Sequence, residues 1–309
     1  MTAPSEAAAT STERVGLLMK HATYASIAVA ATMVVVKLVA WIATDSVSLL
    51  SSFLDSLLDT AAALVNLVAV QQSLAPADRE HRFGHGKAEP LASLGQAAFI
   101  AGSAVLLLIE ALNHLLHPVT VSNTGFGLGV MGFTIVVALG LLSYQRSVVR
   151  RTGSLLVGSD AMHYRADLVL NCSVMVSLVL SAELGWTAID PLFGGAIALW
   201  IIYGAAEVGR KAVFQLMDHE LPDEDRARIR NIALAHQQVK AVHDLRTRTA
   251  GSASFIQIHL EMDGALSLSE AHRVSNAVEA DILAAYPRAE VLIHQDPEGI
   301  DEPRLAFPP

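Results

Sequence analysis

Two short apolar segments carry acidic and histidine side chains at a spacing of one helical turn. Residues 55–59 read DSLLD, and residues 163–167 read HYRAD. On an α-helix, side chains at i and i+4 lie on one face, so Asp55 pairs with Asp59 and His163 with Asp167. Two such helices that face each other can close a site of three carboxylates and one imidazole. That ligand set suits Zn²⁺ and also admits Fe²⁺, Mn²⁺, Co²⁺ or Cd²⁺.

The surroundings of the second segment make its charges costly. Asp160 and Asn171 extend the stripe of His163 and Asp167 within a run that is otherwise apolar. An ionised Asp in the middle of a membrane helix costs about 2.5–3.5 kcal/mol on insertion scales, and such groups usually mark a transport pathway. A hydrogen-bonded polar stripe is the alternative, and the two matched pairs disfavour it. Arg165 lies about 160° around the helix from Asp167, so it is no obvious ion-pair partner.

Two further groups of side chains have metal-ligand chemistry. The loop ADREHRFGHGKAE contains three side chains that can wrap one ion, with a solvated charged loop as the alternative: Asp78, His81 and His85. The last third of the chain contains histidines and an acid that favour a second metal site if they converge, with surface positions as the alternative: His243, His259, His272, His294 and Asp296, with His236 nearby.

Six apolar stretches are each long enough to cross a bilayer. The chain has 309 residues, of which 52% are hydrophobic and 17% charged, whereas soluble domains usually carry about 25% charged residues. A spanning helix needs about 20 residues. The predicted spans are 22–44, 46–73, 90–114, 123–146, 154–183 and 188–210. The composition therefore predicts a polytopic α-helical membrane domain embedded in a lipid bilayer.

Lys and Arg residues gather at one end of this predicted bundle. They precede the first span, separate the second from the third and the fourth from the fifth, and follow the sixth. The connections after the first, third and fifth spans contain none. Because basic loops are retained in the cytoplasm, the sequence predicts that both termini are cytoplasmic.

The last third of the chain has the pattern of a small soluble domain. A charged amphipathic helix at 222–236 precedes two alternating strands at 242–249 and 254–262, which are joined by the turn signal GSAS. Ser267 and Glu270 then form a capping box before a helix, and AEVLIHQD reads as a third strand. The order is αββαβ. Residues 218–309 hold nine basic and 16 acidic residues, which argues against nucleic acid and is compatible with cations.

These patterns divide the chain into four parts. A disordered tail (1–20) precedes the six-helix transmembrane domain (21–211). A cytoplasmic α+β metal-binding domain (212–298) and a flexible tail (299–309) follow.

Taken together, the motifs DSLLD, HYRAD, ADREHRFGHGKAEPLASLGQ, VHDLRTRTAG, FIQIHLEM and IHQDP resemble the cation diffusion facilitator family. The similarity is to its bacterial zinc and ferrous-iron efflux branch and covers about residues 20–298. It implies a homodimer in the bacterial inner membrane, with six spans and a metallochaperone-like cytoplasmic domain. It also implies efflux by proton-coupled antiport with alternating access. Zn²⁺ is the foremost substrate and also a structural or regulatory ion, Fe²⁺ or Cd²⁺ are further substrates, and H⁺ is the coupling ion.

The resemblance also implies a role for each group of residues. It places the transport site at Asp55, Asp59, His163 and Asp167, a loop site at Asp78, His81 and His85, and a cytoplasmic site at His243, His259, His272, His294 and Asp296. It further implies an ion pair at the dimer interface between Lys87 and Asp218.

Two alternatives belong to other functional classes. A membrane prenyltransferase would use an acidic DxxxD motif to hold Mg²⁺-diphosphate, but it needs a second acid-rich motif where this sequence has HYRAD. A membrane-bound metal sensor would bind the same ions without transporting them.

Overall fold

The computed structural model describes residues 6–44, 47–116, 125–184 and 189–299. The chain forms two compact units, one of residues 14–216 and the other containing residues 217–309. We call them the helical unit and the C-terminal unit. The predicted flexible tail at 299–309 lies almost wholly outside the described residues.

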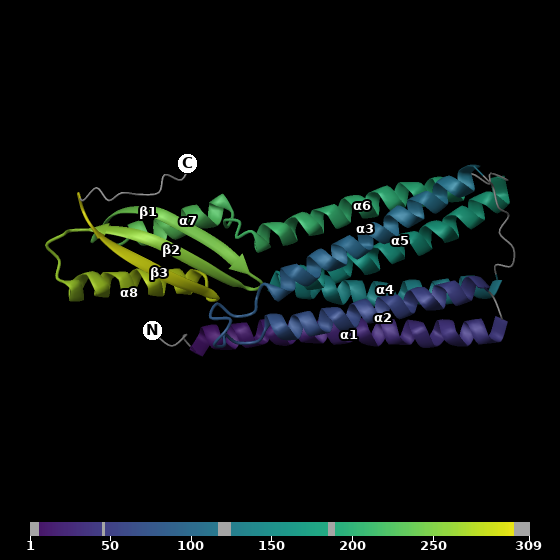
Figure 1. Cartoon of the computed structure of the whole chain (residues 1–309), viewed down its shortest axis with the longest axis horizontal. Helices are drawn as coiled ribbons and strands as arrows, with labels where there is room; N and C mark the ends of the chain where they lie inside the picture. The colour runs from purple at the N-terminus through teal and green to yellow at the C-terminus, as the bar shows by residue number, and fades with distance from the viewer. Residues whose placement is uncertain (1–5, 45–46, 117–124, 185–188, 300–309) are drawn as a thin grey trace. The chain divides into compact units, whose positions relative to one another are not determined.

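Six long helices build the helical unit (Figure 1), and they are α1 (Glu6–Thr44), α2 (Val47–Ser73), α3 (Ala88–Leu116), α4 (Gly125–Thr152), α5 (Leu155–Leu184) and α6 (Ile189–Leu216). Within the described residues, five of them contain a stretch long and apolar enough to cross a membrane, and α5 is the exception. That helix carries Asp160, Arg165 and Asp167 close together. The one helix outside these five, α5, is therefore the helix that carries the candidate ligands His163 and Asp167.

The first helix begins earlier than the sequence analysis predicts. Residues 6–20, assigned there to a disordered tail, are helical in the structure. Their sequence contains no proline after Pro4 and is rich in Ala, Leu and Glu, which are good helix formers. Met19 and Ala22 are buried in a cluster with Val70 of α2, Val148 of α4 and Leu156 of α5. Burial of this face therefore anchors the first helix to its neighbours.

Close contacts between helices hold α5 in place. Helix α3 packs along α6, and α5 contacts α3, α4 and α6. The cluster where they meet includes Ala104 of α3, Ala166 of α5 and Ala205 of α6, and all three are buried. Small side chains let membrane helices approach closely, so the candidate ligands sit on a firmly packed helix.

The C-terminal unit has the predicted αββαβ order (Figure 1). Its elements are α7 (Asp223–Leu234), β1 (Val239–Ala250), β2 (Ala253–Met262), α8 (Leu268–Ala285) and β3 (Ala289–Pro297). Strand β1 pairs antiparallel with β2, and β2 pairs parallel with β3. The turn signal joins β1 to β2, and Gly251 adopts a φ of 60° there. The predicted capping box of Ser267 and Glu270 begins α8.

One face of the sheet is covered and the other carries the polar side chains. Ile256, Ile258 and Leu260 of β2 are buried in a core with residues of α7 and α8. Because side chains alternate along a strand, His259 and Glu261 point to the opposite face. The alternation FIQIHLEM therefore determines which face can bind an ion.

Candidate metal centres

His163 lies between two carboxylates from two helices. Its Nε2 atom is 3.0 Å from Asp59 Oδ1 of α2 and 3.6 Å from Asp167 Oδ2 of α5. One ligand atom from each of the three residues lies within 4.8 Å of the others. An ion that sits about 2.0–2.2 Å from each ligand fits that spacing. One member of the first pair, Asp59, therefore lies beside both members of the second pair, His163 and Asp167.

Asp55 lies one turn from Asp59 and outside that closest group. It lines a cavity of 250 Å³ together with Asp59, Asp167, Asn171 and Lys37. Asn171 belongs to the predicted polar stripe, whereas the sequence analysis did not consider Lys37. The signal for Lys37 was present, because a lysine inside an apolar membrane helix is rare and usually faces a pathway or a partner.

Asp160 is buried one turn before His163 and has four hydrogen-bond donors from four other helices. Ser26 Oγ and Gln145 Nε2 each lie 2.6 Å from Asp160 Oδ2. Asn66 Nδ2 lies 3.3 Å and Gln96 Nε2 lies 3.4 Å from Oδ1. This carboxylate therefore fixes α5 to α1, α2, α3 and α4.

The loop between α2 and α3 brings its three predicted ligands together. Asp78 Oδ1 lies 3.4 Å from His81 Nδ1, and Asp78 Oδ2 lies 3.5 Å from His85 Nε2. The two imidazole rings are 4.5 Å apart. Hydrogen bonds from the backbone N–H groups of His81 and Glu80 hold the pKa of the Asp78 carboxyl below its usual value. The carboxylate is therefore ionised at neutral pH, as a metal ligand must be.

A row of three histidines crosses the open face of the sheet. His243 pairs with His259 in the β1–β2 ladder, and His259 pairs with His294 in the β2–β3 ladder. Asp296, two residues after His294, reaches all three. Its Oδ2 atom is 2.9 Å from His259 Nδ1 and 3.1 Å from His243 Nε2, and its Oδ1 atom is 3.0 Å from His294 Nε2. The strand register therefore builds a cluster of nitrogen and oxygen ligands around one buried carboxylate.

Glu261 belongs to this cluster, although the sequence analysis did not count it among the ligands. Its Oε1 atom lies 3.2 Å from His243 Nε2. Glu261 pairs with Asp296 in the ladder between β2 and β3. The alternation of FIQIHLEM already places it on the face of His259, and only the register shows that it reaches His243.

The structure does not bring His272 to the other ligands within one chain. His272 lies on α8, which packs against the opposite face of the sheet, and its Nε2 atom lies 3.2 Å from Asn276 Nδ2. A helix on the covered face cannot reach a site on the open face of the same chain. A role for His272 as a metal ligand therefore remains a prediction. It would require His272 to reach the site of another chain.

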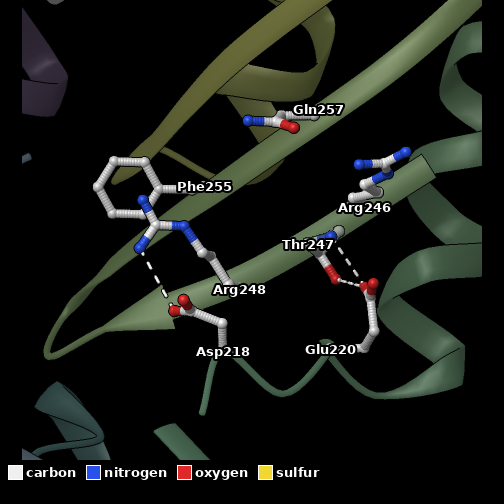
Figure 2. Close-up of a pocket in the computed structure, with 7 residues that line it drawn as sticks. All are labelled: Asp218, Glu220, Arg246, Thr247, Arg248, Phe255 and Gln257. Carbon is white, nitrogen blue, oxygen red and sulfur yellow. Dashed lines mark hydrogen bonds and ion pairs between the residues drawn. The ribbon is translucent and has the colours of Figure 1, made fainter. Parts of the chain in front are cut away.

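Asp218 and Lys87 lie in different units, and each has a partner in its own. Lys87 Nζ donates to the Leu216 carbonyl at 3.3 Å. Asp218 Oδ1 lies 3.4 Å from Arg248 Nη1, and the Arg248 guanidinium stacks over the Phe255 ring at 4.2 Å (Figure 2). The ion pair between Lys87 and Asp218 therefore remains a prediction.

A pocket of 220 Å³ is lined by the pair of Asp218 and Arg248, and its acidic and basic side chains are equal in number. Its lining combines the acids Asp218 and Glu220 with the bases Arg246 and Arg248 (Figure 2). Glu220 accepts hydrogen bonds from the backbone N–H and the hydroxyl of Thr247. These contacts are those of a packed polar surface, and none of the groups of possible metal ligands found among the described residues lines this pocket.

Comparison with known proteins matches both units. Residues 23–217 match the cation efflux transmembrane domain, and residues 221–298 match the cytoplasmic domain of cation efflux proteins. The cation-efflux pump FieF of Serratia proteamaculans is 46% identical over 280 residues, which are 91% of this chain and 93% of that protein. FieF of Shewanella oneidensis is 44% identical over 292 residues, which are 94% and 98% of the two chains.

A solved structure is also similar to about a quarter of the chain. The metal-bound C-terminal domain of the CzcD transporter from Thermotoga maritima is 28% identical, covers 26% of this chain and 93% of its own, and has a TM-score of 0.25. The two domain matches and the full-length relatives agree with the helices and metal-ligand clusters described above. The chain therefore belongs to the cation efflux family, the cation diffusion facilitators, and is a multi-pass membrane transporter of divalent metal cations and not an enzyme.

Proposed function

We propose that this protein exports Zn²⁺ in exchange for protons, with Fe²⁺ and Cd²⁺ as further substrates. The observation that carries the proposal is the group formed by Asp59, His163 and Asp167 between two membrane helices. One imidazole and carboxylate oxygens are the donors that tetrahedral Zn²⁺ accepts. The same donors bind Fe²⁺ and Cd²⁺, because ligand softness separates these ions weakly. Membership of a transporter family excludes the prenyltransferase alternative.

Proton exchange follows from the chemistry of these ligands. A carboxylate or an imidazole binds a metal ion only in its deprotonated form, so metal and protons compete for the same atoms. Asp59 Oδ1 and Asp167 Oδ2 lie 3.0 Å and 3.6 Å from the same atom, His163 Nε2. When the ion leaves, a proton on His163 would be held by both carboxylates. Helix movements that open the site to each side in turn would then exchange one cation for protons.

The orientation and assembly form part of the same proposal. The basic residues lie in the loops at one end of the predicted spans, which favours cytoplasmic termini in a bacterial inner membrane. The cluster of His243, His259, His294 and Asp296 would bind Zn²⁺ in the cytoplasm. Those ions would offset the repulsion between two acidic C-terminal units in a homodimer.

Reconstituted vesicles test the transport site. We would measure Zn²⁺ uptake with a trapped zinc dye and proton release with a trapped pH dye, for the wild type and for Asp59→Asn and Asp167→Asn. Loss of a residue that merely supports a ligand costs about 10–100-fold, so loss of a ligand should lower the flux at least about tenfold. The matched control is Glu110→Gln, since Glu110 is an exposed acid of α3 that pairs only with His114 at 3.0 Å among the described residues.

Three outcomes would each contradict part of the proposal. Wild-type flux in both aspartate variants would remove the site assignment. Wild-type protein that binds Zn²⁺ without moving it would be a sensor. Flux that ignores an imposed pH gradient would leave a uniporter or channel.

A further inference from the structure

Arg165 lies on the face of α5 that points away from the candidate ligands. At about 100° per residue, it is about 160° around the helix from Asp167. Its guanidinium carbon lies 5.1 Å from the centre of the Trp200 ring of α6. Among the described residues, the nearby acids Asp167 and Glu207 pair with His163 and Lys211 and not with Arg165. Binding of the metal ion at the candidate site therefore does not explain why α5 carries Arg165.

A basic cavity opens beside Arg165 between α4, α5 and α6. It has a volume of 440 Å³, and its lining includes Arg146, Arg150, Arg165 and Lys211 with Glu207 as its one acid among the described residues. Lys211 Nζ lies 2.7 Å from Glu207 Oε1, so that acid is already neutralised. Three arginines are left facing the same space. Such a cavity repels a divalent cation and attracts an anion.

The position of the cavity suits a lipid headgroup. Arg146 and Arg150 lie in the last two turns of α4, and Arg165 lies about 15 Å along α5 from its first residue at 1.5 Å per residue. Side chains on a helix lean toward its N-terminus, so Arg165 leans toward the basic end of the bundle. Trp200 and the exposed Tyr203 line the cavity. Such rings are enriched where membrane meets water.

We propose that this cavity binds the phosphate of an anionic phospholipid such as phosphatidylglycerol. Arg146 and Arg150 would hold the phosphate at the basic end of the bundle. Arg165 would reach it from deeper in the membrane, while its guanidinium stays on Trp200. The acyl chains would follow the apolar surface of α6, where Leu199 is exposed. Basic pockets between membrane helices on the cytoplasmic side are known to bind anionic headgroups.

Native mass spectrometry of the purified full-length protein tests the proposal. The protein is mixed with equal amounts of phosphatidylglycerol and phosphatidylcholine that carry the same acyl chains, and the retained lipids are counted. Wild-type protein should retain phosphatidylglycerol in preference. Arg165→Gln and Arg146→Gln should each lower that preference about fivefold, the value of one basic side chain near a headgroup.

Arg210→Gln is the matched control. Arg210 is an exposed arginine of α6 beside Lys211, it stacks over Phe214 at 5.4 Å, and it does not line the cavity. The control removes the same charge from the same end of the bundle but leaves the cavity unchanged. The lipid preference of Arg210→Gln should therefore equal that of the wild type. Equal losses in all three variants would indicate general electrostatics and overturn the site. Equal retention of both lipids by the wild type would do the same.

A second measurement reads the cavity directly. The chain contains three tryptophans, so Trp41→Phe with Trp186→Phe leaves Trp200 as the one emitter. Brominated phosphatidylglycerol in nanodiscs should quench Trp200, and Arg165→Gln should reduce the quenching. If inorganic phosphate at about 10 mM prevents the quenching, the cavity takes free anions and the lipid assignment fails. If Arg165→Gln does not fold, Arg150→Gln replaces it.

Discussion

Replacement of Asp160 by asparagine should destabilise the helical unit without touching a metal ligand. Asp160 accepts two short hydrogen bonds, from Ser26 and Gln145 at 2.6 Å, and two longer ones, from Asn66 at 3.3 Å and Gln96 at 3.4 Å. Asparagine has almost the same shape. It removes the charge and points an amide nitrogen at donors that need an acceptor.

The expected loss can be worked out from these distances. Hydrogen bonds between membrane helices contribute about 0.6 kcal/mol on average and at most about 1.7 kcal/mol. If the two short bonds to the charge contribute about 1 kcal/mol each and the two long ones about 0.5 kcal/mol each, the network contributes about 3 kcal/mol. Asparagine can still accept from some of the donors. We therefore expect Asp160→Asn to lower the free energy of unfolding by about 2–3 kcal/mol.

Unfolding by sodium dodecyl sulfate in mixed micelles, followed by circular dichroism, measures this difference. Glu110→Gln is the control, because an exposed pair such as Glu110–His114 contributes about 0–1 kcal/mol. If the free energy of unfolding of Asp160→Asn lies within about 0.5 kcal/mol of that of the control, the hydrogen-bond network does not stabilise the bundle and the reasoning is wrong. A loss of stability of about 2–3 kcal/mol in Asp160→Asn, with none in the control, would support a stabilising role of the network.

Three further predictions concern the other sites. Asp296→Asn should weaken Zn²⁺ binding to the C-terminal unit at least about tenfold in calorimetry, because Asp296 contacts three histidines, whereas Asp281→Asn, which affects one exposed pair, should not. His163→Asp makes the membrane site all-oxygen and should raise Mn²⁺ flux relative to Zn²⁺ in the vesicle assay, and an unchanged ratio would place selectivity elsewhere. The hydrogen bonds from the Ser267 hydroxyl and N–H lower the pKa of Glu270, so this carboxylate stabilises the fold above its unfolded pKa and loses that effect as the pH falls through its folded pKa. The difference in thermal stability between wild type and Glu270→Gln should therefore shrink on acidification from pH 7 to about pH 4, and a constant difference would contradict it.

Periodicity in the sequence predicts the faces of single elements well. The i,i+4 spacing predicts that His163 and Asp167 share one helix face, and the alternation of β2 predicts that His259 faces away from the core. Both predictions depend only on the geometry of one helix or strand. The capping box at Ser267 is equally local, and the structure contains it.

Contacts between different helices and strands could not be predicted from the sequence in the same way. Nothing in the sequence indicates that Ser26, Asn66, Gln96 and Gln145 would converge on Asp160, because each is an ordinary polar residue within its own helix. The approach of Glu261 to His243 depends on strand register, and the distance of His272 from the site depends on which face α8 covers. The early start of α1 depends on the burial of Met19 against three other helices.

The charged side chains of α5 fall on two sides of the helix, and those on the side of the candidate ligands are stabilised in two different ways. At about 100° per residue, Asp160, His163 and Asp167 fall within about 60° of one another, and Arg165 lies about 140–160° away. Asp160 accepts hydrogen bonds from fixed neutral donors, so it can serve as a permanent anchor. His163 and Asp167 have only each other and Asp59 as charged partners within 4 Å among the described residues, so their charge balance would change with any ion or proton bound there. An anchored helix with one exchangeable charge cluster can release a cation without losing its own position, and this is the property that a transport site requires.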